Sequence, residues 1–240
     1  MKILLPKQHG AWAMLLIPFL LGMLGGEATI FHLPFLFGWL FLYLATVPIF
    51  MLLKKKKIAL HKKWSIIYIS LALVFLVFPL YEEWRLLFFS FAMIPFFLIN
   101  VYFTKRKKER AFLNDVSAII IFGIGGLASY FLGSGTLDGT AWLIFIYSFF
   151  FFLGSTFYVK SMIREKKNQT FKWYSWGYHI GLVVMVFVFG HMWLTLAYVP
   201  SLIRAIGLYG KPLPIMKLGI LEIGNSFIFF MTMIMYLTVF

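Results

Sequence analysis

Ionisable and amide side chains interrupt several long apolar stretches of this chain, and their types suit the binding of an anion. Lys160 and Arg164 are four residues apart, so on a helix they share a face and two cations can meet one anionic group. Glu222 and Asn225 are three residues apart and also share a face. A carboxylate in apolar surroundings needs a partner, so we expect an ion pair between Glu222 and Arg204, which we predict to lie at a similar depth.

Further polar residues extend the same layer, and we predict that together they bind a ligand. The predicted set consists of His9, Asn114, Asp115, Lys160, Arg164, Glu165, His179, Arg204, Lys217, Glu222 and Asn225. Polar groups at membrane depth are costly, which makes such residues candidates for function. The cations are expected to contact the anion, the acids and amides to orient the cations, and the two histidines to donate hydrogen bonds or protons. No residue is assigned a catalytic role.

Several of these residues also have an interpretation that needs no ligand. Asn114 and Asp115 are typical of a helix N-cap, where a negative charge suits the positive end of the helix. Arg204 and Glu222 can act only as a clamp between two helices, the nearby cations can form an ordinary charge run, and His179 can be an interfacial histidine. Clustering on one side favours the ligand, because packing alone does not require it.

Signatures of other kinds of site are missing from the sequence. Cys is absent, and we find no paired His at helical spacing, no Asp-x-x-Asp and no Walker-type glycine loop. We therefore predict neither a metal nor a cofactor. Whether the protein is an enzyme stays open.

The elements that must position the polar layer are membrane helices. Hydrophobic residues make up 62% of the chain and charged residues 12%, which excludes an ordinary soluble globule. We expect one integral membrane domain over residues 1–240, because no polar stretch is longer than a loop. The long apolar runs are Ala11–Gly26, Leu33–Leu53, Trp64–Leu80, Leu86–Phe103, Val116–Leu132, Trp142–Val159 and Leu218–Phe240. Each is about as long as a helix that crosses a hydrocarbon core of roughly 30 Å.

The distribution of basic residues predicts the topology. If the amino terminus is cytoplasmic and the spans alternate, all but Arg85 of the 22 Lys and Arg residues lie on the cytoplasmic side. This pattern predicts a multi-pass membrane protein whose basic loops all face the cytoplasm. The formal charge of +14 is then explained by cytoplasmic loops that meet anionic lipid headgroups, and not by nucleic acid.

Residues 177–208 decide the number of helices. One span there would place Arg204, Lys211 and Lys217 outside, whereas a reversal around Gly190–Trp193 returns all three to the cytoplasmic side. We therefore predict an all-α bundle of nine helices, and a long tilted seventh helix, giving eight, is the alternative. Gly123, Gly125 and Gly126 in the fifth helix are expected to allow close approach of another helix or a ligand.

The opening segment Pro6-Lys7-Gln8-His9-Gly10-Ala11-Trp12 resembles the start of the YwiC-like family of bacterial membrane proteins. Similar matches are Leu113-Asn114-Asp115, Lys160 with Ile163-Arg164-Glu165, Tyr178-His179, Pro200 with Arg204, and Lys217 with Gly219 and Leu221-Glu222. The resemblance covers nearly the whole chain. It implies a multi-pass protein of the bacterial cytoplasmic (inner) membrane and no particular activity.

A nine-helix bundle with a polar site on its inner face is also similar to the UbiA prenyltransferase architecture. That superfamily holds magnesium and a prenyl diphosphate with Asp-rich motifs after its second and sixth helices. Here the first of those loops, Lys54–Lys63, contains no acid, and the second carries Lys160, Arg164 and Glu165. None of that family's catalytic residues is therefore transferred. What the resemblance still implies is the scaffold alone, in which cations would contact a phosphate directly without magnesium.

The function that these observations favour is the binding of an amphipathic anionic molecule, such as a phosphate-headed isoprenoid or lipid. Membrane lipids are the expected partners. The alternatives are a divergent UbiA-type prenyl or lipid transferase without the Asp-rich motifs, a proton-coupled transporter that uses Glu222 and His179, and a structural membrane subunit.

Overall fold

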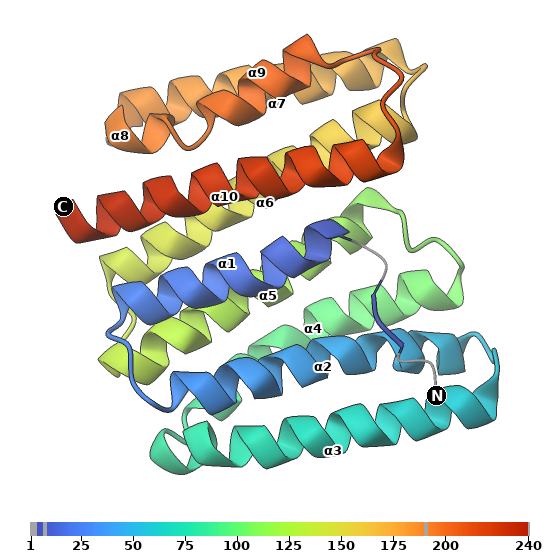
Figure 1. Cartoon of the computed structure of the whole chain (residues 1–240), viewed down its shortest axis with the longest axis vertical. Helices are drawn as coiled ribbons and strands as arrows, with labels where there is room; N and C mark the ends of the chain where they lie inside the picture. The colour runs from blue at the N-terminus through green and yellow to red at the C-terminus, as the bar shows by residue number, and fades with distance from the viewer. Residues whose placement is uncertain (1–3, 7–8, 190–191, 240) are drawn as a thin grey trace. The chain divides into compact units, whose positions relative to one another are not determined.

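The structure is a computed structural model that describes residues 4–6, 9–189 and 192–239, and these residues form helices and connecting loops without a β-strand (Figure 1). The helical elements are α1 (His9–Gly25), α2 (His32–Leu53), α3 (Ile58–Glu82), α4 (Leu86–Lys105), α5 (Phe112–Ser134), α6 (Gly139–Ile163), α7 (Gln169–Phe189), α8 (Met192–Thr195), α9 (Val199–Gly207) and α10 (Ile215–Val239). Because α8 is a single turn of four residues, nine helices of nine residues or more remain among the described residues. The prediction of an all-α bundle with nine helices is confirmed.

Six of the described helices, α2 to α6 and α10, are long and apolar enough to cross a membrane. The helix α1 and the α8–α9 segment are apolar but shorter. Large apolar side chains remain exposed along the long helices, for example Val77 (61%) on α3 and Phe91 (62%) on α4. A soluble protein rarely leaves so much apolar surface in water, so these faces are suited to contact lipid.

The chain divides into two compact units, Met1–Phe145 and Ile146–Phe240, and the boundary falls within α6. Each unit is described by itself below. The first contains α1 to α5, and the second contains the larger part of α6 together with α7 to α10.

The first unit is built around a contact between α1 and α5 in which two backbones meet. A Cβ added at Gly22 would lie 2.2 Å from the carbonyl oxygen of Gly126, and one added at Gly126 would lie 2.7 Å from that of Pro18. Glycine is required at both positions because any side chain would push the helices apart. The close approach predicted at Gly126 is confirmed, and Gly125 meets the indole of Trp39.

Buried hydrogen bonds fix the same helices. The Ser129 hydroxyl donates to the Phe19 carbonyl oxygen at 2.8 Å, and Nε2 of His32 lies 2.8 Å from the Ser129 carbonyl oxygen. His32 is 2% exposed. It therefore links α2 to α5 through a buried hydrogen bond. Water does not compete for this bond, so it is stronger than it would be at an exposed position.

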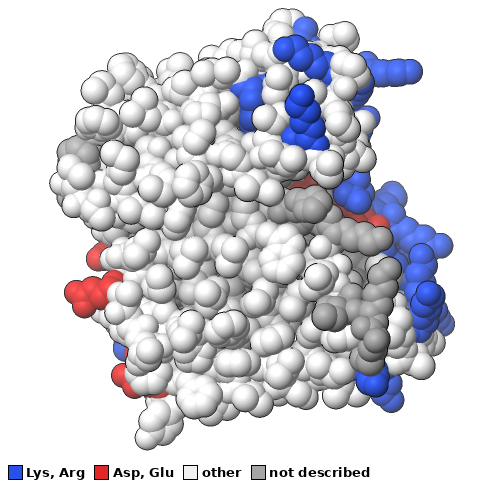
Figure 2. All heavy atoms as spheres, in the orientation of Figure 1, with Lys and Arg blue, Asp and Glu red and all other residues white. Residues whose placement is uncertain are grey.

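Opposite ends of the first unit differ in charge. Figure 2 shows its Lys and Arg side chains gathered mainly at one end, while most of its visible acidic side chains lie at the other. At the basic end, Lys54 forms an ion pair with Glu109 and so joins the α2–α3 connection to the α4–α5 connection. At the acidic end, Asp138 accepts backbone hydrogen bonds from Thr140 and Ala141 and thereby caps α6.

Arg85, the exception to the predicted charge pattern, has a local counterion. Its Nε and Nη2 donate to the two carboxylate oxygens of Glu83, at 2.8 and 2.5 Å. These hydrogen bonds lower the pKa of Glu83 below its ordinary value, so both Glu83 and Arg85 are charged at neutral pH. The exception therefore adds no net positive charge to this loop.

The second unit contains the reversal predicted from charge. Helix α7 ends at Phe189, and α9 returns alongside it, since the Trp176 indole donates to the Ala205 carbonyl oxygen at 3.0 Å. Gly190 and His191, within the predicted turn, lie outside the described residues. The alternative of one long seventh helix is wrong, because α7 and α9 are separate helices that pack on each other. Pro200 occupies the first turn of α9, where a missing N–H costs little.

Candidate functional site

The centre of the site in the second unit is a buried ion pair between Arg204 of α9 and Glu222 of α10. The side chains are 8% and 9% exposed, respectively. Glu222 lies seven residues after the start of α10, which at 1.5 Å per residue is a depth of about 10 Å. The ion pair predicted from sequence is confirmed.

Two residues of α6 complete the surroundings of the guanidinium. Nη2 of Arg204 donates to the Ser155 hydroxyl at 3.2 Å, and the guanidinium carbon lies 4.3 Å from the centre of the Tyr158 ring. Tyr158 is fully buried. A cation over an aromatic face is stabilised most when water is excluded, as it is here.

One turn deeper along the same two helices lies a second polar contact. The Asn225 amide donates to the Ser201 hydroxyl at 2.9 Å, and both residues are buried. Ser201 precedes Arg204 by three residues and Asn225 follows Glu222 by three, so the two contacts lie along one seam between α9 and α10. The predicted shared face of Glu222 and Asn225 is thereby placed against α9.

Several buried polar atoms of this cluster have no hydrogen-bond partner within the described chain. They are Nε of Arg204, the hydroxyl of Tyr158, Oδ1 of Asn225 and Nε2 of His179. Such atoms are few in native proteins, and each calls for an explanation such as a bound molecule or water. The seam thus offers unused donors and acceptors around an ion pair whose net charge is zero.

His179 reaches the cluster from α7. Its Nδ1 lies 2.7 Å from the Ser175 carbonyl oxygen, and Nε2 points toward α6, since a Cβ added at Gly154 would lie 3.2 Å from that nitrogen. The side chain is 2% exposed. The structure thus places the His179 side chain in the interior of the second unit.

Three further predicted cations of the second unit, called the rim below, lie at or next to the ends of its helices. Lys160 is half-buried near the end of α6, whereas Arg164 and Lys217 are exposed. Glu165 accepts a hydrogen bond from the Asn168 amide at 2.9 Å, and Asn168 in turn caps α7 by accepting from the Phe171 N–H at 3.1 Å. Glu165 therefore has a role in the α6–α7 connection.

The predicted residues of the first unit serve the α4–α5 connection. The interpretation of Asn114 and Asp115 as an N-cap is wrong, because α5 begins at Phe112 with Ala111 in the cap position. Asn114 instead donates from its amide to the Glu109 carbonyl oxygen at 2.8 Å. Asp115 lies in the first turn of α5, where its charge suits the helix dipole.

His9 begins α1. Its side chain lies outside the described atoms.

Sequence reasoning missed three members of the cluster, namely Ser155, Tyr158 and Ser201. Serine and tyrosine are common in membrane helices and carry no charge, so composition does not distinguish them. Their one signal is spacing: Ser201 and Arg204 are three residues apart, as are Ser155 and Tyr158.

Taken together, the spanning helices and the buried ion-pair seam define a multi-pass helical membrane protein. The profile of the family described as "YwiC-like protein" matches residues 5–130. The chain is 49% identical over 238 residues to "Uncharacterized protein YwiC" of Bacillus subtilis, covering 99% of this chain and all of that protein. It is also 42% identical over 235 residues to an "Uncharacterized protein" of Haemophilus influenzae, covering 98% of each. The chain therefore belongs to the YwiC-like family.

The resemblance to the UbiA architecture stays a prediction. No solved structure matches this chain. Among residues 4–6, 9–189 and 192–239, no group of three or more His, Asp or Glu side chains is placed to hold a metal ion.

Proposed function

We propose that this protein binds an amphipathic anion, such as a phosphate-headed isoprenoid or lipid, at the Arg204–Glu222 seam of its second unit. The single observation that supports this function is the Arg204–Glu222 seam, which is buried and charged yet retains unused hydrogen-bonding atoms. We place the site in the cytoplasmic leaflet of the bacterial inner membrane, with the amino terminus inside, because the positive-inside rule assigns the basic loops there.

A purely structural clamp would not explain the seam equally well. A buried ion pair is stabilising only when further hydrogen bonds satisfy the remaining donors and acceptors, because both charges lose their hydration. Here Nε of Arg204 and the Tyr158 hydroxyl remain without a partner in the described chain. A ligand with acceptor oxygens would satisfy the arginine donor.

The charged rim supplies the attraction for an anion. Lys160 lies near the end of α6 and Lys217 in the first turn of α10, and both helices carry members of the seam. In this proposal Lys160, Arg164 and Lys217 contact the phosphate, while Glu222 holds Arg204 in place. His179 and Asn225 supply hydrogen bonds deeper in the seam.

The surroundings of the seam favour an amphipathic molecule over a small hydrated anion. Tyr158, Met162, Ala205 and Leu218 form an apolar cluster next to the ion pair. In this proposal a ligand bound at the seam lies beside these side chains, so an apolar tail next to its charged head lowers the cost of entry. An inorganic phosphate would have to lose its hydration without that gain.

The experiment compares farnesyl phosphate with farnesol, which has the same tail without the phosphate. The thermal unfolding midpoint of the purified protein is measured with each. Farnesyl phosphate at about a hundredfold excess over Kd should raise the midpoint by about 5 °C or more, because a ligand that binds the folded state stabilises it by mass action. Farnesol should produce a much smaller shift.

Two double variants with equal loss of charge test the rim. Lys160→Gln with Lys217→Gln should abolish the difference between the two ligands, whereas Lys166→Gln with Lys167→Gln in the α6–α7 connection should keep it. Equal shifts by farnesol and farnesyl phosphate would refute phosphate recognition. Equal losses in both double variants would show that only general surface charge acts.

A further inference from the structure

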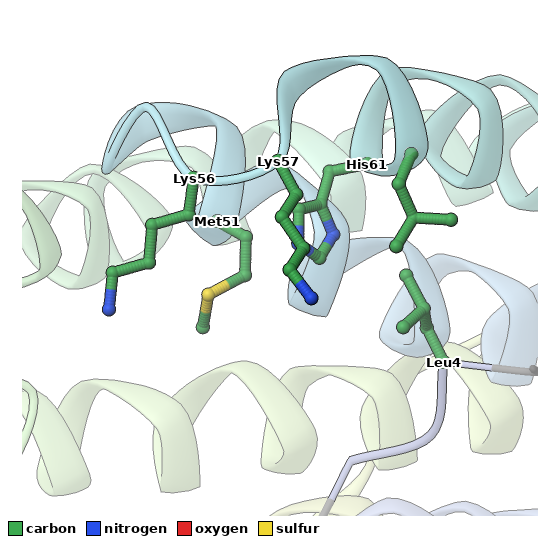
Figure 3. Close-up of a pocket in the computed structure, with 6 residues that line it drawn as sticks. Leu4, Met51, Lys56, Lys57 and His61 are labelled. Atoms are coloured by element: carbon green, nitrogen blue, oxygen red, sulfur yellow. The ribbon is translucent and has the colours of Figure 1, made fainter.

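We propose that the first unit holds the headgroup phosphate of an anionic lipid in a hollow at the α2–α3 connection. The hollow has a volume of about 460 Å³ and is lined by Leu4, Met51, Lys56, Lys57, Leu60 and His61 (Figure 3). This site belongs to another unit than the Arg204–Glu222 seam, and it does not depend on the function proposed there.

Two cations face this hollow from a tight turn. Lys56 and Lys57 lie on the connection itself, and they line the hollow together with His61 of α3 (Figure 3). Lys54, at the start of the same connection, is engaged by Glu109. Lys56 and Lys57 are therefore the cations that line the hollow.

The first turn of α3 adds backbone donors. Lys57 is the N-cap residue of α3, with φ of 39°, and no side chain caps this helix end. The first N–H groups of a helix have no partner within the helix, and they carry the positive end of its dipole. A phosphate next to Lys57 would meet both a cation and these donors.

Buried polar atoms without partners provide the second, independent observation. His61 is 7% exposed, and its Nδ1 has no hydrogen-bond partner among the described residues. Trp64 and Ser65, three and four residues further along α3, are also buried, and the indole N–H and the hydroxyl likewise lack a partner there. Of these three residues, His61 lines the hollow, so its unused ring nitrogen is the polar atom that points to a ligand there.

The apolar part of the lining identifies the ligand as a lipid and not free phosphate. Leu4, Met51 and Leu60 lie in the same hollow as the two lysines. The Leu4 segment is held in place because the Tyr68 hydroxyl donates to the Leu4 carbonyl oxygen at 2.9 Å. An acyl chain can cover these side chains while its headgroup meets the cations, whereas free phosphate leaves them uncovered.

The test counts lipids on the purified full-length protein by native mass spectrometry. Phosphatidylglycerol is titrated against phosphatidylcholine with the same acyl chains. We expect one phosphatidylglycerol to bind at least about tenfold more tightly than phosphatidylcholine, since each cation near an anionic headgroup contributes favourably. Equal affinities for the two lipids would overturn recognition of an anionic headgroup.

The matched variants separate this hollow from general surface charge. Lys56→Gln with Lys57→Gln should weaken binding of phosphatidylglycerol by about tenfold or more. Lys62→Gln with Lys63→Gln removes the same charge from exposed positions of α3 that do not line the hollow, and should change affinity little. Equal weakening in both double variants would overturn the site.

A competition experiment distinguishes lipid from free phosphate. Glycerol 1-phosphate in excess should leave the bound phosphatidylglycerol in place, because it lacks the acyl chains. Displacement of the lipid would show that the phosphate alone accounts for binding and would overturn the assignment of a lipid.

Discussion

At the scale of single residues, the buried Lys, Arg, Asp and Glu side chains of the described chain meet in one contact. Arg204 and Glu222 neutralise each other between α9 and α10, and Ser155 and Tyr158 complete the contact from α6. Removing one partner leaves the other as an uncompensated charge in apolar surroundings. Replacing both leaves no such charge.

The Glu222→Ala substitution should therefore lower the free energy of unfolding by about 3–5 kcal/mol. The double variant Arg204→Met with Glu222→Leu should recover most of that loss, because apolar side chains of similar volume then fill the seam. Urea unfolding in detergent, followed by circular dichroism, measures both. The double variant should still lose its response to farnesyl phosphate. Equal losses of stability in the single and double variants would contradict a buried ion pair.

A pH effect is expected at the basic end of the first unit. Partial burial raises the pKa of Glu109, but the ion pair with Lys54, a backbone hydrogen bond and the charge of Arg110 together lower it by more, so the net pKa lies below the ordinary value. The contribution of the pair is thus fully present above the ordinary carboxyl pKa of about 4.3 and is lost as the pH falls through the lower value of the folded protein.

The Glu109→Gln variant should consequently unfold at a lower temperature than the natural protein at pH 6.5, and this difference should shrink near pH 4 and below. Thermal scans of both proteins over this range make the measurement. A difference that does not vary with pH would show that Lys54 does not stabilise the ionised Glu109.

At the scale of elements, the contact of α1 with α5 depends on glycine. The Gly22→Ala substitution places a methyl group against the Gly126 carbonyl oxygen, 2.2 Å away before any adjustment. Because backbone cannot move aside as a side chain can, we expect a loss of about 1–3 kcal/mol. The control is Gly181→Ala in α7, where nothing lies within 4 Å of the added Cβ. That change should be neutral or stabilise by about 0.5–1 kcal/mol through helix propensity. Urea unfolding that ranks the two variants the other way would refute the contact.

Much of the arrangement of elements was predictable, because the lengths of the apolar runs and the positions of the basic loops allow few topologies. The reversal after α7 followed from the positions of Arg204, Lys211 and Lys217 alone. The start of α5 was misplaced because Asn114 and Asp115 match the chemistry of an N-cap, whereas the helix begins two residues earlier. The pairing of α1 with α5 was not predictable, since membrane helices are apolar on all faces and give no sign of their partner.

At the scale of the whole molecule, the location of the basic loops on one side of the membrane remains a prediction. Cysteine labelling can test it without background labelling of native thiols. The chain contains no Cys, so any introduced thiol is the only one. In intact cells, an impermeant maleimide should label Glu82→Cys, while Lys56→Cys and Lys167→Cys should react only after permeabilisation. Labelling of Lys167→Cys from outside would contradict the proposed orientation of the second unit.

The most direct measurement of the proposed function is photo-crosslinking with a photoactivatable isoprenoid phosphate and its phosphate-free alcohol, followed by mapping of the labelled peptides. The phosphate compound should label the seam-forming parts of the second unit, namely residues 155–164, 199–207 and 215–226, and an excess of farnesyl phosphate should suppress this labelling. The alcohol should label lipid-facing helices such as α4 without suppression. The same labelling pattern from both compounds would contradict a phosphate site at the Arg204–Glu222 seam.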